Sequence, residues 1–229
     1  MSIARILIIA GAVGVAASVA TAHGVDDATR AFLLENQGTA VVPFLYIGAK
    51  HMVTGYDHLL FLVGVVFFLY NKRDVLVYVS FFTLGHSLTL LLGVLAEVNL
   101  NAYLIDAIIG LSVVYKGFDN LGGFKRLLGY QPNTKAAVLI FGLFHGFGLA
   151  TKLQEFELPR EGLVQNLISF NVGVELGQFV ALGLVLIALA YWRRHRSFLR
   201  WATVTNVWLM SGGFLLMGFQ ITGYIVSRG

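Results

Sequence analysis

Six long runs of apolar residues constrain this chain more than any other feature of its sequence. The runs cover residues 53–70, 75–96, 102–121, 136–153, 163–192 and 202–226. An α-helix rises about 1.5 Å per residue, so about 20 apolar residues are needed to cross the hydrocarbon core of a bilayer. Each run is near that length, and the fifth is long enough that it must tilt or protrude. We therefore expect an all-α membrane protein in which residues 51–229 form a six-transmembrane-helix bundle.

The composition supports this class and excludes several others. Only 12% of the 229 residues are charged, whereas soluble domains carry about 25%. Cysteine is absent, which excludes disulfides and thiolate metal sites. The four methionines include the initiator, so copper(I) bound through sulfur is not expected. The net charge of +4 lies in a few short loops, so the expected partner is the lipid bilayer and not a nucleic acid.

The N-terminus is predicted to be a cleavable signal peptide at residues 1–22. Arg5 precedes an apolar run at residues 6–20, and the small residues that end the segment are typical of a cleavage site. An uncleaved first span is the alternative, but the run is short and rich in Ala and Gly, which favours cleavage. Residues 23–50 are mixed in character and are predicted to be a periplasmic N-terminal segment that Pro43 divides.

The charges of the loops predict an orientation. Basic residues occur in every second loop, at residues 72–73, 125–135 and 193–200, while glutamates occur in the loops between them. Basic loops of membrane proteins face the cytoplasm. This pattern predicts a protein of the bacterial inner (cytoplasmic) membrane whose mature N-terminus is periplasmic.

Ionisable residues stand at the start of the first apolar run, where His51 is followed by the adjacent Asp57 and His58. On one continuous helix, His51 and His58 would share a face about 10 Å apart along the axis. One ion cannot easily contact both imidazoles at that separation. The spacing instead suggests His51 as an outer capture group and Asp57 with His58 as a deeper one. Because charged side chains are costly in lipid, we interpret these residues as metal ligands.

Further polar residues lie inside the later runs. The candidate metal ligands of the whole chain are His51, Asp57, His58, His86, Asp106, His145 and Glu175. The residues predicted to orient these ligands are Thr83, Ser87, Asn171 and Gln178. On the predicted topology, this set forms a polar funnel that opens outward and narrows toward the centre of the bilayer.

The acids of this set need a positive partner, because a buried carboxylate is costly unless it is paired, protonated or bound to a cation. Lys116 and Asp119 are expected to pair with each other, and Lys152 to reach Glu155 or water. No lysine or arginine is then left for the other acids. A lone membrane histidine is often only a hydrogen-bond donor between helices. The full set of imidazoles and carboxylates, in contrast, suits a divalent ion of nickel, cobalt, zinc or iron.

Two G-x-x-x-G pairs, Gly142 with Gly146 and Gly173 with Gly177, allow helices to approach closely. Both pairs flank candidate ligands, so we expect the fourth and fifth runs to pack together around the site. No convincing internal repeat supports an inverted-repeat transporter.

Four sequence blocks resemble the HupE/UreJ family of hydrogenase- and urease-accessory membrane proteins. They are the H-x5-D-H arrangement at residues 51–58, Phe-Thr-Leu-Gly-His-Ser-Leu-Thr at 82–89, Phe-Gly-Leu-Phe-His-Gly-Phe-Gly-Leu-Ala at 141–150 and Phe-Asn-Val-Gly-Val-Glu-Leu-Gly-Gln at 170–178. The blocks occur in family order, and the match covers most of the chain. Two departures, Asp106 where glutamate is expected and the second half of the third block, indicate a divergent branch.

The resemblance implies a nickel or cobalt permease that feeds metalloenzyme assembly. It implies that His51, Asp57 and His58 bind the ion on its entry path and that His145 and Glu175 bind it deeper in the membrane. A metallochaperone or a metalloenzyme-maturation protein is then a candidate partner.

From the residues themselves, more than one function remains open. In a permease, several partial sites in series pass a divalent ion inward, and such sites must empty as well as fill. In an intramembrane zinc-type hydrolase, histidines and carboxylates hold the metal with an open position for water. An accessory or scaffold protein would handle metal equally well without Asp57, His58 or Glu175. We favour the transporter over the enzyme because the ligands are spread along the predicted path.

Overall fold

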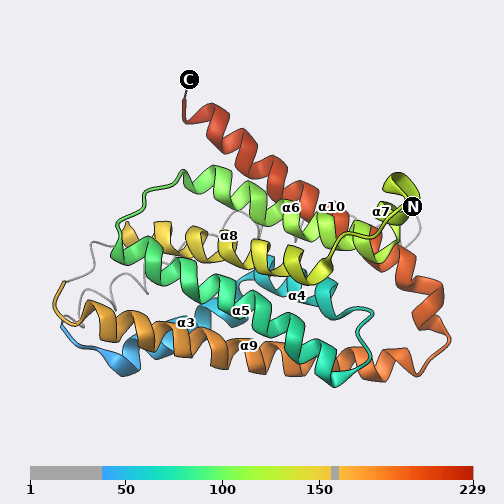
Figure 1. Cartoon of the computed structure of the whole chain (residues 1–229), viewed down its shortest axis with the longest axis horizontal. Coiled ribbons are helices and arrows are strands. Elements are labelled where there is room, and N and C mark those ends of the chain that lie inside the picture. Colours follow the sequence, from blue (N-terminus) through green and yellow to red (C-terminus); the bar gives the residue numbers. More distant parts are fainter. Residues whose placement is uncertain (1–37, 156–159, 229) are drawn as a thin grey trace, which may run out of the picture.

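The computed structural model describes residues 38–155 and 160–228, and helices account for most of them (Figure 1). The helices are α3 Val41–Thr54, α4 Tyr56–Val66, α5 Lys72–Leu95, α6 Ala102–Asn120, α7 Gly123–Leu128, α8 Thr134–Gln154, α9 Leu163–Arg193 and α10 Ser197–Val226. Within the described ranges there is no strand, so the all-α prediction is confirmed. The predicted signal peptide, residues 1–22, and the first part of the segment 23–50 lie outside the described residues.

Asparagine side chains cap three of the long helices. The Oδ1 atom of Asn71 accepts a hydrogen bond from the amide of Arg73 at the start of α5, at 3.0 Å. Asn101 caps α6 and Asn133 caps α8 in the same way, through amides of the first helical turn. Those amides have no partner inside the helix, so the asparagines stabilise each helix start.

Glycines join the long helices into three closely packed pairs, α3 with α9, α5 with α8 and α6 with α10 (Figure 1). The glycines at these contacts are Gly48, Gly173 and Gly177 in the first pair, Gly85, Gly142 and Gly146 in the second, and Gly110, Gly117 and Gly213 in the third. A Cβ atom at each position would lie against the partner helix, in most cases against its backbone. Small residues therefore set the distance between the helices of each pair.

This packing corrects the expectation for the two G-x-x-x-G pairs. We expected them to join the fourth and fifth runs, which form α8 and α9. Gly142 and Gly146 instead face α5, and Gly173 and Gly177 face α3. The prediction was wrong because small residues indicate a close approach without indicating which helix approaches.

Helix α4 is short and lies among the three pairs, in contact with α3, α5, α6, α9 and α10. At its C-terminus, the guanidinium of Arg193 donates hydrogen bonds to the carbonyl oxygens of Val66, Phe67 and Leu69 at 2.5 to 2.9 Å. The last carbonyls of a helix lack the usual amide partner four residues on, and a positive charge is favourable there. Arg193 of α9 thereby holds the end of α4 in place.

The first apolar run is not one helix. Gly55 separates α3 from α4 in an extended conformation, with φ −72° and ψ 97°. We expected a continuous helix over residues 53–70 and a break at Pro43, and both expectations were wrong. Pro43 lies in the first turn of α3, where a missing amide is tolerated. Because α3 packs along α9, the predicted boundary between residues 50 and 51 falls inside a helix of the bundle.

Four of the described helices, α5, α8, α9 and α10, are long and apolar enough to cross a membrane. Helix α6 matches the third predicted run but carries Asp106, Lys116 and Asp119, and α4 has only 11 residues. Lys116 and Asp119 pair with each other at 2.5 Å, as expected from their spacing. The protein is therefore a helical membrane protein with four candidate spans among the described residues, and a count of six stays a prediction.

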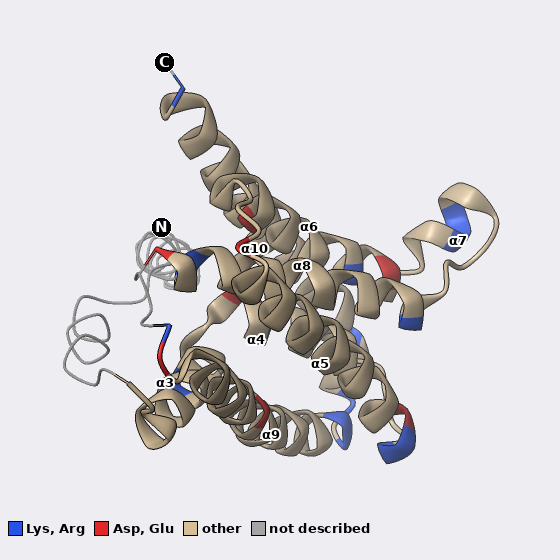
Figure 2. Cartoon of the chain, turned by 60° about the vertical axis from the view of Figure 1, so that its left-hand side comes forward, with Lys and Arg blue, Asp and Glu red and all other residues tan. Residues whose placement is uncertain are grey.

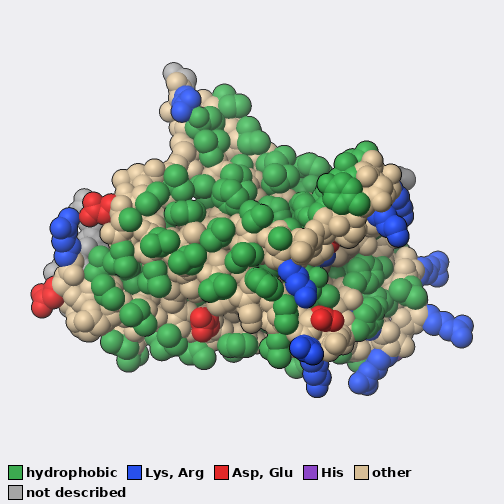
Figure 3. Space-filling view, in the orientation of Figure 1, with side chains coloured by type: hydrophobic (Ala, Val, Ile, Leu, Met, Phe, Trp, Pro, Cys, Tyr) green, Lys and Arg blue, Asp and Glu red, His purple; other side chains and the backbone are tan. Residues whose placement is uncertain are grey.

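The surface agrees with this class. Large apolar side chains such as Leu184 and Ile187 are exposed along the long helices. Figure 3 shows apolar side chains spread over the whole of one face. Lys and Arg gather around α7, the starts of α5 and α8 and the end of α9 (Figure 2). This grouping is the one that the loop charges predict, although the orientation in a membrane stays a prediction.

Candidate functional site

Four histidines from four helices meet inside the bundle, and we call them the histidine cluster: His51 of α3, His58 of α4, His86 of α5 and His145 of α8. His58 stands between the other three. Its ring centroid lies 5.1 Å from that of His51, 5.7 Å from that of His86 and 4.8 Å from that of His145. The side chains of His58, His86 and His145 are buried, with at most 3% of their surface exposed.

The chain break at Gly55 brings His51 and His58 together. On a continuous helix they would lie about 10 Å apart, and the observed ring contact shows that this expectation was wrong. The extended backbone of Gly55 turns α4 away from the axis of α3, so that the two rings meet edge to face. A single glycine inside an apolar run is only a weak signal for such a break.

Phenylalanine rings surround the cluster. Phe82 lies 5.1 Å from His145 and 6.0 Å from His86, and Phe61 lies 5.4 Å from His145, between ring centroids. Apolar surroundings of this kind lower the local dielectric constant and strengthen any charge interaction among the imidazoles.

Two of the histidines have one ring nitrogen fixed by an acceptor. Nδ1 of His58 lies 3.0 Å from Oδ1 of Asp57, and Nδ1 of His145 lies 2.7 Å from the carbonyl oxygen of Phe141. A carboxylate and a carbonyl only accept hydrogen bonds, so each Nδ1 carries the proton and each neutral ring has its lone pair on Nε2. Metal-binding histidines are typically held in this way.

His86 differs from these two. Both of its ring nitrogens are buried and make no hydrogen bond to any described residue, and the same holds for Nε2 of His58. Buried polar atoms are nearly always hydrogen-bonded in folded proteins. The orphaned imidazole nitrogens therefore point to a group that the cluster binds.

The cluster is not a complete chelating site in this conformation. Within residues 38–155 and 160–228, no three His, Asp or Glu side chains are placed to hold one ion together. The nearest carboxylate, that of Asp57, is used by His58. What the structure brings together is three imidazoles that each contact the ring of His58, with Asp57 beside His58.

Asp106 lies elsewhere and has its own cation. Nζ of Lys152 is 3.0 Å from its carboxylate, and Nε2 of Gln220 donates to it at 3.4 Å. The expectation that Lys152 reaches Glu155 or water, with no basic residue left for Asp106, was wrong. Helices α6 and α8 are neighbours in the bundle, which brings the two charges together, and the sequence does not show that neighbour relation.

Glu175 is exposed on α9 and lines a pocket between α5 and α9 that contains none of the four histidines. Beside it, Oε1 of Gln178 accepts a hydrogen bond from the hydroxyl of Thr83 at 3.2 Å. Ser87 and Asn171 each have a buried oxygen atom without a hydrogen-bond partner among the described residues. The residues predicted to orient the ligands thus lie on α5 and α9, and none of their described hydrogen bonds reaches an imidazole.

Two features of the site are not apparent from the sequence. The carbonyl oxygen of Phe141, which orients His145, is a backbone atom, so the residue type does not reveal its role. Gly55, which turns α4 toward the cluster, looks like any other glycine in an apolar run. Its place between His51 and His58 is the one signal that could have revealed it.

A comparison with known protein families adds one finding. The family model described as "HupE / UreJ protein" matches residues 27–228, a range that includes the whole histidine cluster. No curated protein and no solved structure matches the chain.

Proposed function

Since the chain belongs to the HupE/UreJ family, we propose that it is a membrane permease for a divalent transition-metal ion, which it takes from the periplasmic side. The observation that carries the proposal is the pair His58 and His145. Their rings are 4.8 Å apart, and both have Nδ1 bound to an acceptor, so that both lone pairs are on Nε2. Two neutral imidazoles held in this way suit a borderline metal ion.

The contacts of His58 suggest a path for the ion. The ring of His58 touches those of His51, His86 and His145. In the proposed mechanism, His51 receives the ion, His58 takes it next, and His86 and His145 hold it before its release inward. A conducting site must bind an ion well enough to fill and weakly enough to empty. Imidazoles engaged two at a time meet that requirement better than one closed tetrahedral site.

Nickel or cobalt is the proposed substrate, with zinc and iron as the other ions to be tested. Imidazole nitrogen binds all of these divalent ions, so the donor set alone does not separate them. The family is named for hydrogenase- and urease-accessory proteins, which favours nickel and a metallochaperone or metalloenzyme-maturation protein as recipient. The zinc-type hydrolase that the sequence left open finds no support in the family match.

Uptake of metal ions into vesicles that contain the purified protein tests the proposal. His58→Ala removes the central ring of the cluster, and we expect the initial rate of uptake to fall at least about tenfold. His145→Ala should have a similar effect. Running the wild type with nickel, cobalt, zinc and iron identifies the preferred substrate.

His195→Ala is the matched control, because His195 is exposed in the loop after α9 and its ring contacts only that of Tyr191 among the described rings. Its uptake should equal that of the wild type. Equal uptake by the wild type and by all three variants, with insertion and helix content confirmed, would contradict the permease.

A further inference from the structure

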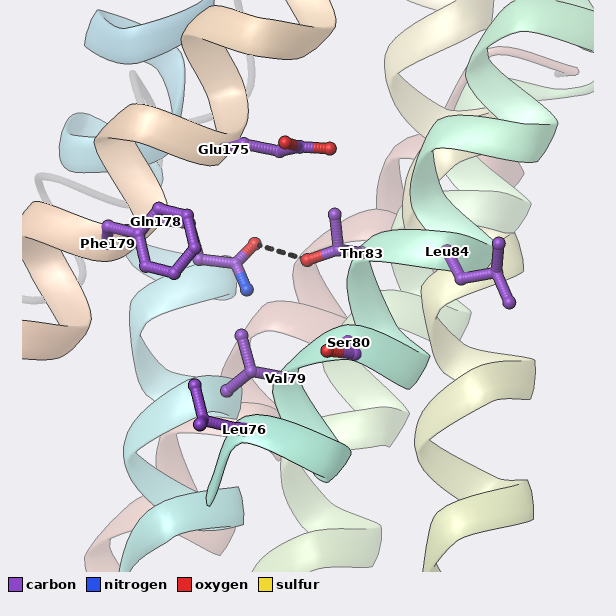
Figure 4. A pocket seen from close by; sticks show the side chains of 8 residues that line it. All are labelled: Leu76, Val79, Ser80, Thr83, Leu84, Glu175, Gln178 and Phe179. Carbon is purple, nitrogen blue, oxygen red and sulfur yellow. Dashed lines mark hydrogen bonds between the residues drawn. The ribbon is translucent and has the colours of Figure 1, made fainter. Parts of the chain in front are cut away.

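The pocket between α5 and α9 is a second polar site, separate from the histidine cluster. It has a volume of about 440 Å³, and leucine, valine and phenylalanine side chains form the apolar part of its lining. Glu175 and Gln178 point into it from α9, and Thr83 faces them from α5 (Figure 4). Ser80 lines it one turn before Thr83. A carboxylate, an amide and two hydroxyl groups thus meet in one cavity.

One buried polar group in this pocket, the side-chain amide of Gln178, is only partly hydrogen-bonded. Gln178 is only 2% exposed, and its Oε1 accepts a hydrogen bond from Thr83 at 3.2 Å. Its Nε2 atom is buried and makes no hydrogen bond to any described residue. Nε2 only donates hydrogen bonds, but rotating the amide by about 180° lets it donate to the Thr83 hydroxyl and leaves Oε1 as the buried atom without a partner. Such an orphaned oxygen costs free energy unless a cation or water satisfies it. The pocket is therefore built for an occupant.

The charge of the pocket indicates the kind of occupant. Glu175 forms no ion pair with any residue of the described ranges, and the pocket has no lysine or arginine in its lining. Glu175 lies in the middle of α9, one of the candidate spans, where a carboxylate without a positive partner is costly. A cation in the pocket would balance this single negative charge.

The donor atoms of the pocket indicate which kind of cation it would bind. All the candidate ligands here are oxygen atoms, from the Glu175 carboxylate, the hydroxyls of Ser80 and Thr83 and the amide of Gln178. Oxygen donors favour hard cations, whereas the imidazoles of the histidine cluster favour transition metals. One carboxylate among neutral oxygens matches a single positive charge. We propose that the pocket between α5 and α9 binds a sodium ion, with Glu175 as its charged ligand.

The position of the pocket links it to the histidine cluster. Thr83 and His86 are three residues apart on α5 and so lie on the same side of that helix. An ion bound between Glu175 and Thr83 draws α9 and α5 together one turn from His86. Through this link, sodium binding would be coupled to metal transport. The coupling rests on the proposed metal transport, whereas the sodium site itself does not depend on it.

Binding of ²²Na⁺ to the purified full chain in nanodiscs tests the site without any transport step. The wild type should show saturable binding that unlabelled NaCl displaces and choline chloride does not. Glu175→Gln should weaken binding at least about tenfold, because it removes the only charged ligand. Thr83→Val should weaken it to a smaller extent. Glu97→Gln is the matched control, because Glu97 is an exposed acid in a loop, and its binding should equal that of the wild type.

Three results would overturn the sodium site. The first is no saturable binding by the wild type, and the second is equal binding by the wild type and Glu175→Gln. A third is an infrared band of a protonated carboxylic acid that disappears in Glu175→Gln and does not respond to NaCl, since a proton would then occupy the pocket. Helix content and thermal unfolding of Glu175→Gln serve as the check of folding, and Thr83→Val decides if that variant is misfolded. Because sodium binding and nickel uptake are measured separately, failure of one leaves the other standing.

Discussion

The imidazole ring of His145 lies 4.8 Å from that of His58 in edge-to-face contact, and each ring has Nδ1 fixed by an acceptor on its own helix. The two rings come from α8 and α4, which are distant in sequence. Their contact depends on where α4 begins and ends, and Gly55 and Arg193 determine this. Substitutions that move α4 or α8 should therefore change metal binding without removing an imidazole.

Gly55→Ala is expected to weaken metal binding while helix content stays the same. A Cβ atom at this position would lie 3.0 Å from the carbonyl oxygen of His51 and 3.2 Å from Nδ1 of His58. The backbone angles of Gly55 are open to alanine, so the crowding of His58 carries the effect. Affinity for nickel, measured by calorimetry, should fall about three- to tenfold. Gly183→Ala is the matched control, because its Cβ would meet nothing within 4 Å; an equal loss in both variants would refute the explanation.

Asp57→Asn is expected to lower the affinity for metal about 10- to 100-fold, the usual effect of losing a group that orients a ligand. The neutral amide is a weaker acceptor for Nδ1 of His58 and supplies no negative charge beside the bound ion. Nitrogen NMR of the ring should show both tautomers in the variant and one in the wild type. Asp106→Asn should leave the affinity unchanged, since Asp106 pairs with Lys152 outside the cluster. The interpretation fails if both substitutions lower affinity equally.

Lys152→Met is expected to lower the stability of the protein rather than its metal affinity. The substitution leaves the carboxylate of Asp106 buried, with 4% of the side chain exposed and no cation beside it. Breaking a buried ion pair in this way costs about 3–5 kcal/mol. Thermal unfolding in detergent measures the effect. The double variant Asp106→Leu/Lys152→Met should recover much of the loss, and a double variant less stable than the single one would contradict a simple ion pair.

Gly142→Val is expected to force α5 and α8 apart and to reduce uptake. A Cβ at Gly142 would lie 2.5 Å from the carbonyl oxygen of Phe82, so the helices must separate to admit any side chain. Crowding of a packed interior typically costs about 1–3 kcal/mol. Because His86 and His145 are on these two helices, uptake of nickel should fall together with thermal stability. Gly218→Val, at a position where a Cβ meets nothing within 4 Å, should change neither.

The long helices were the part of the fold that the sequence predicts well. The run at residues 75–96 corresponds to α5, Lys72–Leu95, and the run at 163–192 to α9, Leu163–Arg193. In a membrane protein, both the lipid-facing and the inward-facing sides of a helix are apolar, so length alone is a strong signal. The prediction of one span over the first run was wrong because α4 is buried among other helices. A short buried helix is as apolar as part of a membrane span, so composition does not separate the two.

Contacts between helices were the part that the sequence does not predict. The spacing along one helix correctly indicated the pair Lys116–Asp119. It could not indicate that Lys152 of α8 reaches Asp106 of α6, since this depends on which helices are neighbours. For the same reason, Glu175 was grouped with the histidines, whereas the structure places it in a pocket that contains none of them.

The three glycine-packed helix pairs have a mechanical consequence. At most of these glycines the two backbones are in direct contact, with no side chain between them to rearrange, so the two helices of each pair should move together as one unit. Sliding or tilting movements of the helices would then occur mainly at the contacts between one helix pair and the next. His51 belongs to the α3–α9 pair, His86 and His145 belong to the α5–α8 pair, and His58 belongs to the short helix α4 between them. If the proposed metal ion binds between these imidazoles, it would hold the two helix pairs together, and its release would let them move apart.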